Sequence, residues 1–466
     1  MAELIFSIER NSQIPMYHQV YQYIRTQITS GKLPHGTRLP SIRELARQLD
    51  VSRNTTQLAY EQLLSEGYLR SEHKKGFFVE AKMSDSVFAY ERIPDTADPV
   101  VPTNRHHIDF RTGTVDQDSF PLAKWRRHSN KIMNDPSLYS YGDKQGDTEL
   151  RRELENYLFQ SRGVQAAADQ IIIGAGTKSL LLILLLILRS HHVIAVEDPG
   201  YDLSRKLFTL MGFEVHPTPV TSSGIHTEEL RQSPATLLYT TPTHHYPTGV
   251  TMPVNQRLDL LRWAHEVDGY IIEDDYDSEF RYIHQPVPSL QSMDHSGRII
   301  FMGTFSKALL PSIRISYMVL PPSLLTLYRE NAGLFEQSAS PIHQKTLARF
   351  MKDGHWYPHL RKLKALYRNR MNVLVRELRQ AFQTDIDIKG EHSGIFVVVE
   401  LKTDQTEVEL IEKASNHGVG VYGCSKYFVE AKPRYPHLQL GLGKLSEEEI
   451  VEGVSRLMRA WERPRE

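Results

Sequence analysis

The sequence is poor in the features that mark secreted and disulfide-bonded proteins. Its 466 residues include one cysteine, Cys424, so an internal disulfide and a cysteine-based zinc site are both excluded. We interpret Cys424 as a small, partly buried side chain. The first residues, MAELIFSIERNSQ, lack the basic segment and the long apolar core of a signal peptide. We therefore expect a protein of the reducing cytoplasm.

Long apolar runs and a net charge of either sign are also missing. The longest apolar run, residues 180–188, is nine residues long, whereas about 20 are needed to cross a bilayer. We predict a buried core helix there. The formal net charge is -1, so the overall charge neither favours nor excludes nucleic acid. Any surface that binds nucleic acid must therefore be local.

Histidine occurs in three adjacent pairs, at 106–107, 191–192 and 244–245, which raises the question of a metal site. Neighbouring side chains of a helix or strand point in different directions and do not converge on one ion. We therefore expect no metal site at these pairs.

The pattern along the chain divides it into three regions. Residues 1–80 are dense in short helical segments, and residues 81–107 have scattered prolines and no periodicity, which is typical of a linker. From residue 108 to residue 466, short apolar runs such as QIIIGAG, HVIAVED and GYIIEDD alternate with helical segments. This alternation predicts an α/β domain with a mostly parallel sheet.

The N-terminal region has the order of elements of a winged helix-turn-helix. Apolar residues recur at helical spacing over residues 15–30, and a second helix is predicted to begin at Ser41, with Glu44 completing a capping box. A third helix is predicted over residues 52–65. Two short strands then surround a Lys-Lys-Gly tip at residues 74–76. The region therefore predicts a DNA-binding domain over residues 1–80.

The start of the third helix carries side chains that can donate to phosphates or read base edges. Between residues 32 and 53 five Lys and Arg residues face two acids, a local charge of +3. The alternative is a small helical module for protein contacts, with a charged face that is merely solvated. The candidate DNA-binding residues from this pattern are Ser52, Arg53, Asn54, Thr55 and Thr56 on the helix, and Lys74 and Lys75 on the wing.

Over about residues 12–80 the sequence resembles the GntR-type winged helix. The resemblance rests on GTRLPSIRELARQLDVSRNT and on the later G-F-F-V strand. It implies DNA contacts by Arg43, Arg53 and Thr55, and by Gly76 at the wing. Many members of this family carry an arginine where this chain has Gln57, so the operator preference at that position is open.

In the larger region, the motif GTFSKALLPSIRISY follows an apolar strand. Lys307 in this motif is suited to form a Schiff base with an aldehyde. Thr304, Ser306 and Arg314 are suited to hold a phosphate beside it. The usual alternative for a single Ser-Lys pair is a surface lysine.

A second motif, IIEDDYDSEF, places Asp274 at the end of a predicted strand. A carboxylate in this position can pair with a pyridinium nitrogen and keep the ring electron-withdrawing. Tyr276, two residues later, could hydrogen-bond a ring hydroxyl. The alternatives for such an acidic run are a metal site or a solvated turn. The apolar strand before it argues that Asp274 is buried and needs a partner.

Two further motifs follow predicted strands. GAGTKSL combines a glycine-rich turn with a helix start, which forms a cradle of backbone N–H groups for an anion around Gly176 and Thr177. Its spacing is that of neither a P-loop nor a dinucleotide fingerprint. EDPGY places Tyr201 just past a Pro-Gly turn, where its ring could stack on a flat heteroaromatic ring.

Over about residues 108–466, the order of these motifs resembles the fold-type I PLP enzymes of the aminotransferase family. Together with the winged helix, it resembles the MocR/GabR-type regulators of the GntR superfamily over essentially the whole chain. The resemblance implies pyridoxal 5′-phosphate (PLP) bound to Lys307, a smaller C-terminal subdomain over about residues 320–466, and a homodimer, often head-to-tail. It implies a PLP site formed by Gly176, Thr177, Tyr201, Asp274, Tyr276, Thr304, Ser306, Lys307 and Arg314.

Departures from the family pattern concern the ligand pocket. Tyr246 stands where aminotransferases carry the asparagine of N-P-x-G, which leans away from an efficient enzyme. Leu203 and Tyr435 stand where regulators that sense γ-aminobutyrate carry arginines. We therefore expect a different effector. Arg434, one position before Tyr435, is a candidate for binding an effector carboxylate or is a surface charge.

These observations predict a bacterial transcriptional regulator that binds operator DNA and responds to an amine or amino-acid-type effector through aldimine exchange at Lys307. Two alternatives stay open. The chain could be a PLP-dependent aminotransferase with an appended DNA-binding domain, or a regulator that senses PLP itself. Whether any turnover occurs is therefore open.

Overall fold

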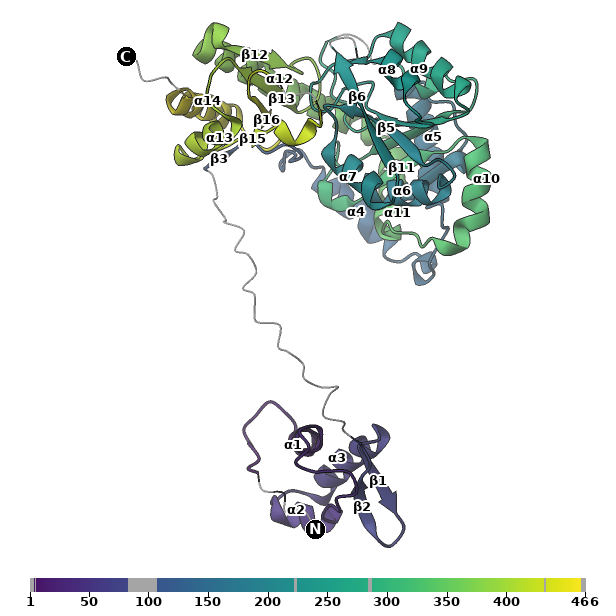
Figure 1. Cartoon of the computed structure of the whole chain (residues 1–466), viewed down its shortest axis with the longest axis vertical. Coiled ribbons are helices and arrows are strands. Elements are labelled where there is room, and N and C mark those ends of the chain that lie inside the picture. Colours follow the sequence, from purple (N-terminus) through teal and green to yellow (C-terminus); the bar gives the residue numbers. More distant parts are fainter. Residues whose placement is uncertain are drawn as a thin grey trace. The chain divides into compact units, whose positions relative to one another are not determined.

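The computed structural model describes residues 4, 6–82, 107–221, 224–283, 287–430 and 433–461. The chain forms two compact units, Met1–Thr103 and Asn104–Glu466, which are drawn in Figure 1. The predicted linker over residues 81–107 falls almost entirely on residues 83–106, which lie outside the described residues.

The N-terminal unit has the predicted elements. Helices α1 (Met16–Thr29), α2 (Ile42–Gln48) and α3 (Arg53–Ser65) precede strands β1 (Leu69–Glu72) and β2 (Gly76–Val79), which pair antiparallel. Helices α2 and α3 begin where serine side chains accept a backbone N–H three residues on, because such caps satisfy free donors of the first turn. The core is formed chiefly by Val20, Ile24, Ile28, Leu45, Ala59, Tyr60, Leu63 and Val79.

Two expectations for this unit need correction. The capping box at Ser41 is only half formed. Ser41 Oγ accepts the Glu44 N–H, but the Glu44 carboxylate pairs with Arg47 at 2.7 Å. Thr56 was expected to face DNA, yet its side chain is fully buried because the fourth residue of α3 turns toward the core. It therefore packs inside the domain.

The large unit is built on an eight-stranded sheet with the order β4-β11-β10-β9-β8-β5-β6-β7. Strands β10, β9, β8, β5 and β6 run parallel, and β11 is antiparallel to both its neighbours, so the sheet is mostly parallel as predicted. The strands are β4 (Ile171–Gly174), β5 (Val193–Asp198), β6 (Glu214–Thr221), β7 (Gly224–Ile225), β8 (Leu237–Thr240), β9 (Tyr270–Asp275), β10 (Ile299–Thr304) and β11 (Ser316–Val319).

Helices cover both faces of this sheet, which explains why its strands are almost continuously apolar. Ile300 and Met302 of β10 pack with the leucines of α6 on one face, whereas Phe301 joins the core on the other. The helix predicted over residues 180–188 is found as α6, but only one face of it is buried, since Leu182 and Leu186 are exposed. The helices are α4 (Leu122–Ile132), α5 (Thr148–Arg162), α6 (Thr177–Ile187), α7 (Asp202–Leu210), α8 (Thr227–Gln232), α9 (Val254–Glu266), α10 (Pro322–Asn331) and α11 (Pro341–Lys352).

A smaller layer follows the long helix α12 (Trp356–Phe382) and is seen around β12 to β16 in Figure 1. Its four-stranded antiparallel sheet has the order β12-β13-β16-β15. Strand β3 (Ile108–Asp109) pairs with β14 (Val419–Gly420), so the first strand of the large unit is part of the smaller layer. The remaining elements are β12 (Ile386–Lys389), β13 (Phe396–Leu401), α13 (Glu407–Asn416), β15 (Tyr422–Gly423), β16 (His437–Gly441) and α14 (Glu447–Trp461).

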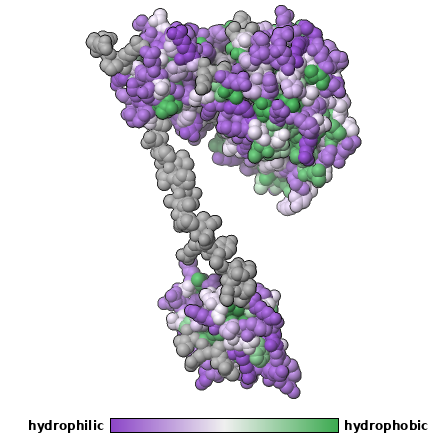
Figure 2. All heavy atoms as spheres, in the orientation of Figure 1, coloured by the Kyte–Doolittle hydropathy of each residue, from purple (hydrophilic) through white to green (hydrophobic). Residues whose placement is uncertain are grey.

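The exterior of the molecule is predominantly polar on the face shown in Figure 2, with apolar side chains scattered among hydrophilic ones. Within the part of the chain that the structure describes, none of the helices has the length and apolar character needed to cross a membrane.

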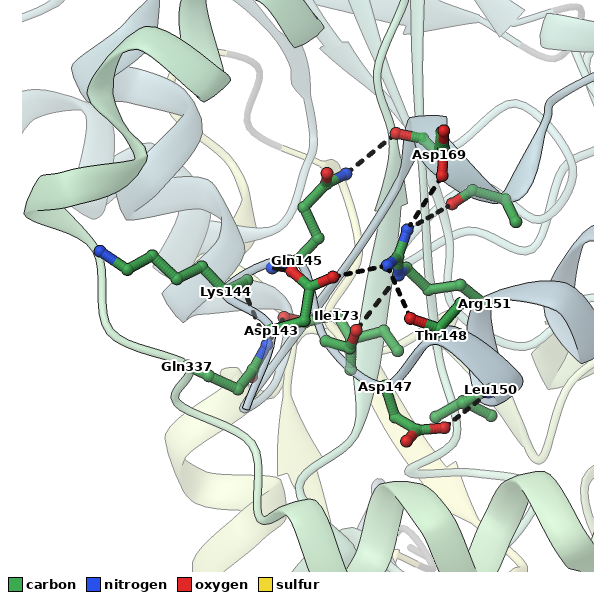
Figure 3. Close-up of polar contacts among 12 residues, drawn as sticks. Asp143, Lys144, Gln145, Asp147, Thr148, Leu150, Arg151, Asp169, Ile173 and Gln337 are labelled. Carbon is green, nitrogen blue, oxygen red and sulfur yellow. Dashed lines mark hydrogen bonds and ion pairs between the residues drawn. The ribbon is translucent and has the colours of Figure 1, made fainter. Parts of the chain in front are cut away.

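Arg151 of α5 binds the loops on either side of its own helix, at residues 143–146 and at residue 168 (Figure 3). Its buried guanidinium donates to the carbonyl oxygens of Gly146 at 3.1 Å and Ala168 at 3.2 Å. It also pairs with the Asp143 carboxylate at 2.8 Å and binds Thr148 Oγ1 at 3.2 Å. One side chain therefore satisfies acceptors from three segments.

We expect Arg151→Met to lower the free energy of unfolding of the large unit by about 2–4 kcal/mol, because it leaves buried acceptors without donors. Urea denaturation followed by tryptophan fluorescence measures the change. Arg152→Met, at an exposed position of the same helix, is the control and should stay within about 0.5 kcal/mol of the unsubstituted protein. Equal midpoints for the two variants would contradict a stabilising role of this network.

Candidate functional site

A cavity of about 410 Å³ opens at the carboxyl ends of β8, β9 and β10, beside the start of α6. Ligands of open α/β sheets bind at this edge because the loops after parallel strands gather there. All nine residues of the predicted cofactor site line this one cavity, namely Gly176, Thr177, Tyr201, Asp274, Tyr276, Thr304, Ser306, Lys307 and Arg314.

Lys307 lies just after β10 and points into the cavity, where its side chain is largely shielded from solvent. Burial lowers the pKa of the Lys307 ammonium, and the Asp277 carboxylate opposes this shift. A Cβ built on Gly113 would lie 3.3 Å from Lys307 Nζ, so a glycine leaves room for the amine. The result is a confined amine in an acidic neighbourhood.

One end of the cavity is suited to an anion. Gly176 caps α6 with φ +99°, and a Cβ there would lie 2.0 Å from Arg314 Nη2. Arg314 donates to the Ala175 carbonyl oxygen at 2.9 Å, which holds its guanidinium beside the helix start. Thr304 Oγ1 lies 3.0 Å from Ser306 Oγ. A cation, two hydroxyls and the positive end of a helix therefore meet at one place.

Asp274, the penultimate residue of β9, is buried and lines the same cavity. Its Oδ2 accepts a hydrogen bond from the Tyr239 hydroxyl. Its Oδ1 is buried and finds no hydrogen-bond partner among the described residues. Burial raises the pKa of Asp274 to about 6. A buried carboxylate with one free oxygen can accept a hydrogen bond from a ligand or from water.

Aromatic side chains form the remaining walls. The Tyr201 ring meets the Tyr246 ring edge-on, with 5.5 Å between centroids. Tyr246 bonds the Tyr427 hydroxyl at 2.7 Å and Gln439 Oε1 at 3.1 Å. Tyr246, at the position where the aminotransferase pattern has asparagine, therefore connects the cavity to the smaller layer.

Sequence reasoning missed about half of the cavity wall. Tyr239 could have been suspected, because β8 lies beside β9 and Tyr239 is paired with Ile272. Since residues two apart on a strand point to the same face of the sheet, Tyr239 lies on the face of Asp274. Lys178 and Asp277 lie within the GAGTKSL and IIEDDYDSEF motifs but were given no role there. Most of the other residues come from distant segments that only the fold assembles. The missed residues are Thr112, Gly113, Lys178, Leu181, Ser204, Tyr239, Thr241, Asp277, Ile395 and Phe396, together with Tyr246, which was weighed only as a departure.

The effector candidate Arg434 is not brought to this cavity. It is exposed, its guanidinium lies 5.1 Å from the centroid of the Tyr435 ring, and it lines a separate groove of the smaller layer. Residues 433–436 lie just before β16. Leu203 is also exposed and is not part of the cavity wall, whereas its neighbour Ser204 is.

In the N-terminal unit, the predicted DNA-binding residues gather at the start of α3 and on the hairpin. Ser52 and Thr55 are engaged with each other, because Ser52 Oγ accepts the Thr55 N–H at 3.1 Å and lies 2.8 Å from Thr55 Oγ1. Arg53, Asn54 and Arg43 are exposed. Within the described residues neither arginine forms an ion pair, so both remain available to phosphates or bases.

The tip of the hairpin is basic and tightly turned. Lys74 and Gly76 have φ values of +59° and +107°, and Lys75 lies 3.2 Å from the Glu72 carboxylate. A Cβ on Gly76 would lie 3.8 Å from Arg38 Nε. Arg38 bridges to Phe78 of β2 and adds a cation at the wing. In the sequence, Arg38 stands out only as one of the five basic residues between residues 32 and 53.

Comparisons with known proteins agree with this division of the chain. Residues 16–79 match the family described as bacterial regulatory proteins, gntR family, and residues 105–457 match aminotransferase class I and II. The uncharacterized HTH-type transcriptional regulator YdeL of Bacillus subtilis is 41% identical over 97% of this chain and 98% of its own length. The probable rhizopine catabolism regulatory protein MocR of Rhizobium meliloti is 33% identical, over 97% and 95%.

Among solved structures, the kynurenine aminotransferase of Pyrococcus horikoshii, in complex with PMP, is similar with a TM-score of 0.68. It is 24% identical, and the match covers 76% of this chain and 90% of that one, which shows the shared fold of the large unit. The chain belongs to the HTH-type transcriptional regulators that include MocR, in which a GntR helix-turn-helix domain precedes a fold-type I, aminotransferase class I and II domain.

Proposed function

We propose that this protein is a PLP-dependent transcriptional regulator, which binds operator DNA and responds to an amine or amino-acid-type effector at Lys307. The observation that carries the proposal is the convergence of Lys307, the free Asp274 oxygen and the anion cradle on one cavity. The similar aminotransferase structure in complex with PMP, the aminated form of PLP, supports the choice of cofactor.

The residues of the cavity fit PLP group by group. The cofactor supplies an aldehyde that condenses reversibly with amines. Lys307 provides such an amine, and its lowered pKa raises the fraction that is neutral and nucleophilic. Asp274 would receive the ring nitrogen at its free Oδ1, and Tyr201 would lie on the ring face. The phosphate would rest among Gly176, Thr177, Thr304, Ser306 and Arg314.

An amine effector would compete with Lys307 for the aldehyde carbon of PLP and would release the lysine side chain. Tyr246 gives this event a route to the smaller layer through its bonds to Tyr427 and Gln439. For the effector to act on DNA binding, two conformations must differ in affinity for both ligands, and the coupling is reciprocal. The exposed position of Arg434 leaves open which residue binds an effector carboxylate.

DNA binding is proposed for the start of α3 and for the wing. Helix α3 would enter the major groove by its first turn, where Arg53 and Asn54 are free of caps and ion pairs. Arg43, Arg38 and Lys75 would contact phosphates, and the backbone at Gly76 would approach the minor groove. In a homodimer, for which a head-to-tail arrangement is proposed, two such units would read two half-sites.

We expect Lys307→Ala to abolish the near-visible absorbance of the PLP-loaded protein, because Lys307 is the shielded amine with a lowered pKa, whereas Lys178, which also lines the cavity, is exposed. Absorbance spectra after PLP is added and the excess removed measure the effect. Lys131→Ala, at an exposed lysine of α4, is the control and should retain the band. Lys307→Ala should also lose the change in DNA footprint that an effector amine causes in the unsubstituted protein. A wild-type response from Lys307→Ala would contradict the proposed mechanism.

Asp274→Asn should stabilise the cofactor-free protein at pH 8 while it weakens PLP binding. Folding raises the pKa of Asp274 from the ordinary 3.8 to about 6. The contribution of Asp274 to the stability of the folded protein is therefore greatest below pH 4 and is lost as the pH rises through 6. An uncharged amide removes this loss, by about 1–3 kcal/mol, but cannot pair with a pyridinium nitrogen. Thermal melts at pH 5 and pH 8, with PLP titrations, test both effects. A variant less stable than wild type at pH 8 would refute the argument.

Arg53→Ala should lower the affinity for a duplex selected from a random library by about tenfold to a hundredfold, or about 1–3 kcal/mol. Fluorescence anisotropy at fixed salt measures this loss, and the base preference should relax at one position. Arg47→Ala is the control of equal charge, since Arg47 is exposed on α2 and pairs with Glu44. Equal losses for the two variants would indicate a charge effect alone and would argue against base recognition by Arg53.

A further inference from the structure

A buried histidine behind the cavity wall contacts a buried carboxylate of the wall itself. His244 Nδ1 is 2.9 Å from each carboxylate oxygen of Asp277, and both side chains are almost completely inaccessible to solvent. The same nitrogen is 3.1 Å from the hydroxyl oxygen of Tyr276, whose ring stacks on the histidine at 5.8 Å. Tyr276 and Asp277 line the cavity, whereas His244 does not.

The position of the proton on His244 follows from its partners. An ionised carboxylate only accepts hydrogen bonds, so Nδ1 must carry the hydrogen that faces Asp277. His244 Nε2 is buried and has no hydrogen-bond partner among the described residues. A second hydrogen there would be buried without an acceptor, which is costly. The hydrogen that His244 shares with Asp277 is therefore on Nδ1.

Glycines from two loops pack closely against the His244 ring, and their lack of a side chain leaves the space that the ring occupies. A Cβ on Gly394 would lie 2.3 Å from His244 Cε1 and 2.7 Å from Asp277 Oδ2. A Cβ on Gly249 would lie 3.2 Å from His244 Nε2. Gly394 belongs to the loop between β12 and β13, and its N–H donates to the Phe280 carbonyl oxygen at 2.7 Å. The smaller layer therefore closes the pocket around His244.

A proton on Nδ1 determines what the Tyr276 hydroxyl can do. Nδ1–H has no lone pair to offer, so the phenol cannot donate to it and can only accept from it. The phenolic hydrogen is then free to point toward the cavity. Burial, with the Asp277 carboxylate as a further cause, raises the pKa of Tyr276, so the hydroxyl keeps its hydrogen. The other titratable groups that act on Tyr276 are Tyr246, Asp274 and Glu197, and Lys307 shares the same cavity.

We propose that His244 is a positioning residue, which is held by Asp277 and turns the Tyr276 hydroxyl so that it donates into the cavity toward the ring oxygen of the cofactor. This rests on the proposed function, because it takes PLP as the ligand. His244 itself touches neither the cofactor nor the effector. Its role is exerted through Tyr276 alone, which makes the effects of the two residues non-additive.

The test is a double-mutant cycle read by the pH titration of the near-visible absorbance of PLP-loaded protein. Without the Tyr276 donor, the ring oxygen of PLP would accept a hydrogen bond from the protonated Lys307 nitrogen alone. That hydrogen bond would be stronger, so the Lys307 nitrogen would lose its proton at a higher pH. Tyr276→Phe should therefore raise the apparent pKa by about one unit. His244→Ala should raise it in the same direction, and the double variant should match Tyr276→Phe. PLP affinity should fall about fivefold to tenfold in all three.

The conservative variant His244→Asn separates positioning from packing. The amide nitrogen of asparagine is as many bonds from Cβ as Nδ1 is, so it retains the donor and should restore the titration of the unsubstituted protein. His245→Ala is the matched control, because His245 is buried in the same loop but bonds Thr248 instead. If His244→Ala does not fold, as judged by its cofactor-free thermal melt, His244→Gln replaces it, since its amide lies one bond further out.

Two results would overturn the inference. One is an additive shift in the double variant, and the other is a His244→Ala titration equal to that of the unsubstituted protein while Tyr276→Phe is shifted. A His244→Asn protein that titrates like His244→Ala would also overturn it. A wild-type protein that shows no near-visible absorbance with PLP would instead refute the proposed function, so the two failures are distinguishable.

Discussion

The large unit depends on how carboxylates are buried at the ends of its parallel strands. Glu197 of β5 accepts from Thr240 and Thr241, and Glu273 of β9 accepts the backbone N–H groups of Leu290 and Gln291. Asp275 pairs with the buried Arg162 at 2.9 Å. Each of these charges is matched within the protein, because an unmatched buried charge would destabilise the fold. Asp274 stands among them with one oxygen left free.

That contrast separates acids whose oxygens are hydrogen-bonded within the protein from Asp274, which keeps one oxygen without a partner among the described residues. Burial raises the pKa of both Glu197 and Glu273 to about 7, but each is surrounded by donors that fix its position. Asp274 differs in facing a cavity that also contains an amine and an anion cradle. A cationic ligand that paired with Asp274 would offset the cost of burying its charge. A strained or unsatisfied group of this kind is expected where stability gives way to function.

The sequence anticipated the fold and the centre of the site to different extents. Strand ends, glycine turns and caps leave local patterns, so Lys307, Asp274, Tyr201 and Gly176 could each be located from a few neighbouring residues. The winged helix was readable for the same reason, since Ser41 and Ser52 mark the helix starts. Thr56 failed because the side of α3 that faces the core depends on how the helix packs. Whether Arg434 would line the Lys307 cavity could not be predicted, because alignment with a motif does not give the direction in which a loop runs.

The sequence alone determined which chemistry the chain carries, because the amine, the carboxylate and the anion cradle are encoded in short motifs at strand ends. The tertiary structure decided how these groups meet, and which others join them. Tyr239 reaches Asp274 across neighbouring strands, and Tyr246 reaches Gln439 across 193 residues of chain. His244 and Asp277 are 33 residues apart and become a bonded pair only through the fold. Contacts of this kind have no sequence pattern, since they depend on the distance between atoms and on the exclusion of water from the space around them.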